Sequence, residues 1–226
     1  MIPEGDRPMY LLGFGHGVSI AAESHGAGTL LWTETRAAGS GFGTGLARFP
    51  FAPGTMLHAS QTRPYGQLAK GYDELTCAID PVYGRMVVRA RRVSDRVHIY
   101  RVFRLEDASA GSFGSPLSAF AQPAAFDAGG DFQGYTLLGS YRYAATGKNG
   151  QNNIRLWSGS ATSGAVVQGN VLSHAGEARG RHSHHEPEGL AIYRTAAGQL
   201  RLIIGVAMGA GGDRRACLFH KDELVW

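Results

Sequence analysis

The hydrophobic residues of this chain fall into short runs that end at glycine or proline. Val97–Leu105, which reads V-H-I-Y-R-V-F-R-L, alternates apolar and polar side chains almost without a break. This alternation is typical of a β-strand with one buried face, because successive strand side chains point to opposite faces. Leu200–Val206 is instead nearly all apolar, as in a strand buried on both faces. No stretch repeats with the helical period, so the pattern predicts an all-β fold.

The predicted strands form modules of strand, turn and strand. They are Met9–Leu12, a strand that ends at Glu23, Thr29–Thr35, Leu46–Phe51, Thr76–Asp80, Arg85–Arg91, Val97–Leu105, Phe132–Leu138, Tyr141–Ala145, Ile154–Trp157, Ala165–Leu172, Leu190–Tyr193, Leu200–Val206 and Ala216–His220. Asp80 is predicted to form a turn and Asp107–Ser115 a loop. Pro50 places its strand at a sheet edge, because proline cannot donate a ladder hydrogen bond.

Modules of three or four short strands recur about every fifty residues, which is the pattern of a β-propeller. We therefore predict one propeller domain over residues 1–226, with four to five blades of short antiparallel strands and residues 1–8 as a tail. A β-sandwich is the alternative, but it would need fewer strands and fewer regularly spaced glycine loops.

The composition is consistent with this architecture and bears on the class of partner that the chain binds. The chain has 33 glycines and only 18% charged residues, and glycine tolerates the positive φ that tight turns need. Its net charge is +4. The dense arginines are Arg89, Arg91, Arg92, Arg96, Arg101 and Arg104. A nucleic-acid site would need them on one face with aromatic residues between them, so we expect no nucleic acid and interpret the set as a cationic face for a phosphate-bearing polymer.

Cys77 and Cys217 follow no metal or redox spacing, and we interpret them as free thiols rather than as a disulfide. No apolar run is long enough for a membrane span, and Met1 opens no signal-peptide pattern.

The stretch from His182 to Glu188, which reads H-S-H-H-E-P-E, concentrates the groups that could carry chemistry. His182, His184 and Glu186 are candidate ligands for a divalent metal such as Zn or Mn, because histidines two apart in an extended chain share a face. Glu186 and Glu188, with His185, are candidate acid/base groups for a glycosidic or phosphodiester bond. The alternatives are a solvated polar loop and a carboxylate that fixes the loop by accepting backbone hydrogen bonds.

Other candidates are ligand-binding residues. His16 lies between glycines, where backbone can approach a ligand closely, although it could equally fill the channel of a ring. Arg214 and Arg215 suit phosphates, whereas amide and aromatic side chains suit sugars. The candidate binding set is His16, Gln133, Tyr135, Glu188, Arg214 and Arg215, with Tyr135 equally suited to the core.

Several motifs carry a resemblance. They include G-F-G-H-G-V-S-I from residue 13, T-C-A-I-D-P-V-Y-G-R-M-V-V-R from residue 76, F-Q-G-Y-T-L-L-G from residue 132 and E-P-E-G-L-A-I-Y from residue 186. In this order they resemble the propeller shared by phage receptor-binding proteins and TagC-like proteins of teichoic-acid gene clusters. The resemblance implies a five-bladed propeller on the phage tail or baseplate that recognises cell-wall glycopolymers. We therefore expect a virion or extracellular location if the chain is phage-derived, and otherwise the cytoplasm.

Members of that family carry about one more blade of strands before the Gly-His-Gly loop. Three closures of the ring therefore stay open: a short first blade, a ring of four blades, or completion by a partner.

Two functions remain. The first is a binding module for a teichoic-acid-like wall polymer or other carbohydrate, without a cofactor, in a homo-oligomer or a phage-tail assembly. The second is an enzyme of the same fold that acts on a polymer or a small molecule through residues 182–188, with or without a metal. We favour the binding module, because no decisive catalytic set stands out.

Overall fold

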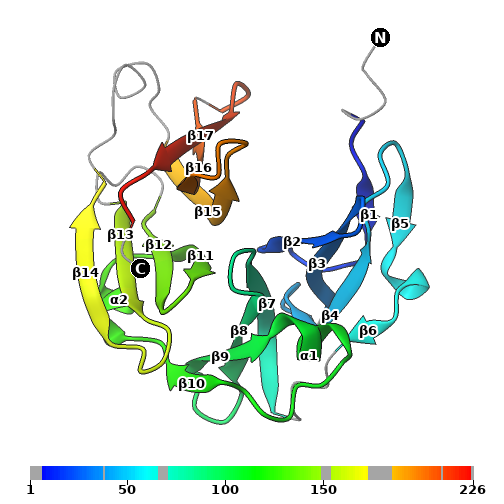
Figure 1. The fold of residues 1–226 in the computed structure, drawn as a ribbon, viewed down its shortest axis with the longest axis horizontal. Helices are drawn as coiled ribbons and strands as arrows, with labels where there is room; N and C mark the ends of the chain where they lie inside the picture. The colour runs from blue at the N-terminus through cyan, green and yellow to red at the C-terminus, as the bar shows by residue number, and fades with distance from the viewer. Residues whose placement is uncertain are drawn as a thin grey trace. The chain divides into compact units, whose positions relative to one another are not determined.

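The computed structural model describes residues 7–37, 39–65, 71–148, 154–172, 185–209 and 211–224. The chain divides into two compact units, Met1–Ala121 and Gln122–Trp226. Each unit contains two antiparallel sheets of three or four strands, in which strands close in sequence are neighbours (Figure 1). The N-terminal unit contains in addition a two-stranded parallel sheet. Strands dominate both units, as predicted.

The first sheet of the N-terminal unit has the strand order β2-β3-β4-β6. Its strands are β2 (Ile20–His25), β3 (Gly28–Ala37), β4 (Gly43–Pro50) and β6 (Pro64–Tyr65). The remaining elements are β1 (Tyr10–Leu12), which pairs in parallel with β5 (Met56–His58), and a 3-10 turn at Ala59–Gln61. Leu11 and Leu57 of this parallel pair pack against a buried cluster of Phe14 with Ala47 and Phe49 of β4, which anchors the pair to the sheet.

The second sheet has the order β10-β9-β8-β7 and is antiparallel throughout. Its elements are β7 (Tyr72–Asp80), β8 (Arg85–Arg92), β9 (His98–Arg104), the short helix α1 (Leu105–Ser109) and β10 (Ser118–Ala121). At the β7–β8 turn, Oδ1 of Asp80 accepts hydrogen bonds from the backbone N–H groups of Val82 at 2.9 Å and Tyr83 at 3.1 Å. The predicted turn role of Asp80 is confirmed.

The C-terminal unit holds the third and fourth sheets. The third contains β11 (Phe132–Leu138), β12 (Tyr141–Thr146), β13 (Arg155–Ser160) and β14 (Val166–Val171), and the helix α2 (Ala124–Ala128) precedes it. The fourth contains β15 (His185–Arg194), β16 (Leu200–Met208) and β17 (Arg215–Lys221). All neighbouring strands in these two sheets are antiparallel.

Four antiparallel sheets that succeed one another along the chain are the β-propeller architecture, so the predicted fold class is confirmed. That one domain spans residues 1–226 stays a prediction. Of the predicted tail, residues 1–6 lie outside the described residues.

Two local predictions are wrong. The predicted loop at Asp107–Ser115 begins inside α1, where Glu106 and Asp107 lie in the first turn and are stabilised by the positive end of the helix. The strand that ends at Pro50 is also not an edge strand, because β4 pairs with both β3 and β6. Pro50 is tolerated there because β6 pairs only with Leu46 and Ala47, so no ladder hydrogen bond is required of the proline.

The two sheets of the N-terminal unit share one hydrophobic core. Its buried members are Ala21, Trp32, Leu46, Leu75, Cys77, Ile79, Met86, Val88, Ala90, Phe103 and Ala108. Trp32 is fully buried, and its ring meets that of Tyr65 edge-on at 5.1 Å. Burial also raises the pKa of the Cys77 thiol to about 12. Both cysteines are free thiols, as predicted.

Glu23 lies at the border of this core and connects three elements. Its carboxylate accepts hydrogen bonds from Nε1 of Trp32 at 2.7 Å and from Nε and Nη2 of Arg48 at 2.9 and 2.6 Å. Burial alone would raise the pKa of Glu23, but the hydrogen bonds from Arg48 and Trp32 hold it below its ordinary value of 4.5. The charged carboxylate is therefore part of the packing of β2 against β3 and β4.

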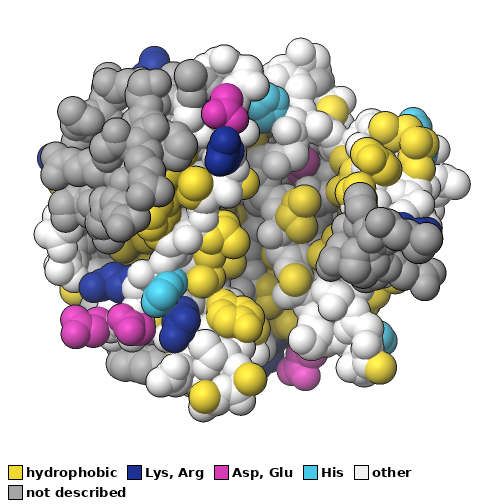
Figure 2. Space-filling view, turned by 90° about the horizontal axis from the view of Figure 1, so that it is seen from above, with side chains coloured by type: hydrophobic (Ala, Val, Ile, Leu, Met, Phe, Trp, Pro, Cys, Tyr) yellow, Lys and Arg dark blue, Asp and Glu magenta, His cyan; other side chains and the backbone are white. Residues whose placement is uncertain are grey.

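The arginines that were interpreted as a cationic face for a polymer mostly meet groups of their own unit. Arg91 contacts Asp73 at 2.8 Å and Glu74 at 2.6 Å. Further contacts are Arg92 with Asp95, Arg104 with Asp107, and Arg101 over the ring of Tyr72. Carboxylates contact Arg91, Arg92 and Arg104, and a cationic face for a polymer stays a prediction. On the face drawn in Figure 2, Lys and Arg side chains lie scattered rather than gathered in one patch.

Replacing Glu23 by glutamine keeps the shape of the side chain and removes its charge. We expect E23Q to lower the free energy of unfolding near pH 7 by about 3 kcal/mol, the low end for a broken buried ion pair. Because the folded pKa of Glu23 is below 4.5, the wild type loses this stabilisation as the pH falls from 4.5 through the folded pKa. Urea unfolding near pH 7 and near pH 3 should show the gap between the two proteins shrinking at the lower pH.

Asp95→Asn is the matched control, because it removes the carboxylate of an exposed pair with Arg92. We expect a smaller loss of stability that added salt reduces further. Equal losses for the two variants, or a gap for E23Q that does not change with pH, would contradict the structural role of Glu23.

Candidate functional site

In the C-terminal unit, β11 and β15 contact each other, and both carry a bulge near their first residues. The ladder register shifts at Gln133 in β11 and at Glu188 in β15, so each of these is an extra residue in its strand. A Cβ atom added to Gly134 would lie 2.9 Å from the Cα atom of Gly189. The two strands therefore approach as closely as only glycine permits.

The bulge of β11 brings two of the predicted site residues together. Nε2 of Gln133 donates to the backbone oxygen of Gly147 at 2.9 Å and, at a longer 3.4 Å, to Oε1 of Glu186. The side chain of Glu186 is half-buried, whereas that of Glu188 is exposed. Because the bulge interrupts the alternation of side chains in β15, alternation no longer places the two carboxylates on one face. Their action as a pair stays a prediction.

The other predicted residues of this unit lie apart from that contact. Tyr135 is only 5% exposed, and its ring lies 5.9 Å from that of Phe132, so it is a core residue. Arg214 and Arg215 are exposed at the start of β17, and Arg215 pairs with Asp213 at 3.4 Å. The predicted roles of the two arginines in ligand binding remain predictions.

His16 is exposed in the N-terminal unit, where its ring lies 5.1 Å from that of Phe42. Its loop is fixed by the buried carboxylate of Glu34, which accepts hydrogen bonds from the backbone N–H groups of Gly17 at 2.6 Å and Gly43 at 2.5 Å. The loop therefore presents the imidazole at the surface in a defined position. A contact between His16 and a ligand stays a prediction.

The predicted metal ligands His182 and His184 lie outside the described residues, and His185 is described only as the first residue of β15. Among the residues whose placement is described, no group of three His, Cys, Asp or Glu side chains could hold a metal ion. The metal site and the catalytic roles of Glu186, Glu188 and His185 stay predictions.

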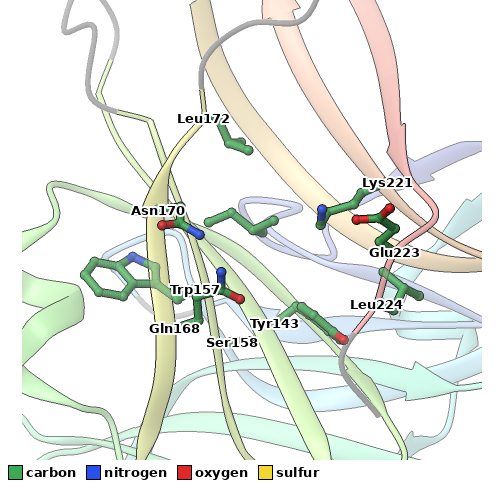
Figure 3. A pocket seen from close by; sticks show the side chains of 10 residues that line it. Tyr143, Trp157, Ser158, Gln168, Asn170, Leu172, Lys221, Glu223 and Leu224 are labelled. Carbon is green, nitrogen blue, oxygen red and sulfur yellow. The ribbon is translucent and has the colours of Figure 1, made fainter.

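A pocket of about 370 Å³ opens in the C-terminal unit, between the third sheet and the segment that ends and follows β17 (Figure 3). Side chains of β12, β13 and β14 form one wall, and Lys221, Glu223 and Leu224 form the other. None of the predicted site residues that the structure describes lines this pocket.

The third sheet places a row of hydrogen-bonding side chains in the wall of this pocket. The ladder register sets Tyr143 opposite Ser158, and Ser158 opposite Gln168. In the next row, Leu156 lies opposite Asn170. Residues directly opposite one another across antiparallel strands share a face. The hydroxyl-bearing residues Tyr143 and Ser158 therefore lie on the same face of the sheet as the amides of Gln168 and Asn170. Figure 3 shows the side chains of Gln168 and Asn170 beside each other on β14.

Ser158 and Tyr143 are the buried residues of this row. Ser158 is 6% exposed, and within the described part of the chain its Oγ has no hydrogen-bond partner. This oxygen has almost no accessible surface, so it lies beneath the surface that a group in the pocket would meet. The side chain of the neighbouring Trp157 lies on the opposite face of the sheet. There its Nε1 donates to Oγ1 of Thr146 at 2.9 Å and its ring packs against Phe126.

Sequence reasoning missed this pocket, although one signal was present. Gln168 and Asn170 stand two residues apart in a predicted strand, so their amides share a face. That Lys221, Glu223 and Leu224 lie opposite them depends on how the third and fourth sheets pack, and no local pattern encodes that packing.

The chain matches, over residues 3–220, the family model of the phage 5-bladed β-propeller receptor binding platform domain. No curated protein matches the chain. In the described residues, none of the helices is long and apolar enough to cross a membrane.

The close contact of the two bulges should make Gly134 intolerant of a side chain. We expect Gly134→Ala to lower the free energy of unfolding by about 1–3 kcal/mol, because its Cβ would overlap the backbone of Gly189. Gly114→Ala is the control, since its Cβ would meet nothing within 4 Å. Thermal unfolding of both variants measures the difference, and an equally stable G134A would show that the strands can separate freely.

Proposed function

Because the chain belongs to the phage five-bladed β-propeller receptor-binding platform family, we propose that it binds a teichoic-acid-like glycopolymer of the host cell wall and leaves it chemically unchanged. The family match carries the receptor-binding role. The glycopolymer is our own addition, and it rests on the chemistry of the groups that the chain exposes.

These groups suit a polymer of sugars and phosphates. The pocket in the C-terminal unit offers hydroxyl and amide side chains, which can exchange hydrogen bonds with sugar hydroxyl groups. Arg214 is exposed outside it, and guanidinium groups bind phosphate oxygens in a bidentate manner. The net charge of +4 favours the approach of a polyanion. We place the protein on the virion, in a tail or baseplate assembly or a homo-oligomer.

Isolated host cell walls test this proposal. We expect the purified protein to bind walls that carry their glycopolymer. We expect no binding to walls from which acid extraction has removed the glycopolymer. Binding should weaken as salt is raised, because screening reduces the attraction between a cationic protein and a polyanion. Sedimentation of protein with the walls measures binding, and analysis of the supernatant measures any released sugar or phosphate.

Equal binding to stripped walls would assign the receptor to another wall component and would overturn the proposal. Steady release of sugar or phosphate by the wild type would replace it with the enzyme alternative. Denatured protein is the control for non-specific adsorption.

A further inference from the structure

We propose that the pocket between the third sheet and the β17 segment binds one uncharged sugar ring of the receptor. This inference rests on the proposed function, because it names the part of the polymer that a defined site recognises. It assigns a ligand to residues that none of the sequence motifs singled out.

The dimensions of the pocket suit a single small unit. Its volume of about 370 Å³ lies at the lower end of the range of roughly 300–1,000 Å³ that is usual for small-molecule sites. A long segment of polymer would not fit, whereas one ring, with the polymer continuing into solvent, would.

The wall of the third sheet matches the hydrogen bonding of a sugar. Gln168 and Asn170 offer both donors and acceptors on one face. Sugar hydroxyl groups also donate and accept, so each can bond to a side chain of this wall. The Oγ of Ser158 has almost no accessible surface and lies beneath the two amides, so the amides are the groups that a ligand would meet. Two exposed amides on one wall of a pocket are the observation that points to a ligand.

Apolar side chains complete the match. Leu156 and Leu172 line the same wall, and Leu224 lies on the other side (Figure 3). The C–H groups of a sugar ring can pack against such side chains while its hydroxyl groups face the amides. Hydrogen-bonding groups set among apolar ones are usual in ligand sites, where the polar groups fix orientation.

The charges at the pocket favour a neutral ring over a phosphate. Lys221 and Glu223 lie on the same wall and have opposite charges, so the pocket has no net excess of cations. A phosphate placed near Lys221 would also lie near the carboxylate of Glu223, and like charges at short range repel. A sugar hydroxyl can bond to either group.

Calorimetry and ligand-observed NMR with a panel of neutral monosaccharides, and with inorganic phosphate, test the inference. We expect at least one monosaccharide to bind wild type, and the Gln168→Ala and Asn170→Ala variants to weaken its binding about tenfold, as for lost ligand hydrogen bonds. Both side chains are exposed, so the variants should fold normally.

Two controls match these variants. Val171→Ala changes the same strand at the position after Asn170, where the side chain points to the other face. Gln199→Ala removes an exposed amide at the β15–β16 turn. Neither should alter sugar binding, and equal thermal unfolding temperatures for all variants confirm that the fold is intact.

The outcomes separate this inference from the proposed function. Wall-polymer binding that is unaffected by Q168A and N170A would overturn the pocket and leave the glycopolymer proposal standing. Sugar binding that these variants weaken, in a protein that does not bind the walls, would support the pocket and overturn the glycopolymer. Phosphate binding that the same variants abolish would overturn the choice of a neutral ring.

Discussion

The contact between the backbones of Gly134 and Gly189 sets the geometry of the C-terminal unit. Because Gly134 has no Cβ, the main chain of β11 can approach the main chain of β15 at Gly189, and the extra residues Gln133 and Glu188 lie outside the regular ladder. The third and fourth sheets touch through β11, β12 and β15. Farther across the third sheet, at β13 and β14, the walls enclose the pocket. The third and fourth sheets are therefore in close contact at β11 and β15, and the pocket lies farther along the third sheet.

In the N-terminal unit, buried carboxylates fix the loop before β2 and connect β2 to β3 and β4. Glu34 fixes the glycine loop before β2, and Glu23 connects Trp32 to Arg48. Each carboxylate is buried and accepts more than one hydrogen bond, so its oxygens find their partners within the fold. Acidic residues in this chain can therefore have structural roles that the sequence alone does not predict. Glu23 and Glu34 of the described N-terminal unit serve packing in this way.

The period-two pattern was enough to predict the fold, because every blade must bury one face of each strand. Val97–Leu105 was predicted as a strand on that ground and Leu200–Val206 from its nearly continuous apolar run, and β9 and β16 are found there. The pattern failed where a local feature has no period: the single turn of α1, the short strand β6 and the bulge at Glu188. It did bring out Gln133 and Glu186, which the structure places in contact. The pocket was missed because its two walls are far apart in sequence, and nothing in Q-G-N at 168–170 indicates what lies opposite.

The pocket also separates the residues that shape it from those that select the ligand. Tyr143 and Ser158 are buried in the third sheet, so changing them disturbs packing as well as binding. Gln168 and Asn170 are exposed on the outer strand β14, where a substitution usually alters stability by less than about 0.5 kcal/mol. A receptor-binding protein whose receptor changes can therefore substitute Gln168 and Asn170 while Tyr143 and Ser158 stay the same. Because the rigid wall fixes where a hydroxyl group must lie, one exchanged side chain on β14 is enough to favour a different sugar, without new demands on the rest of the fold.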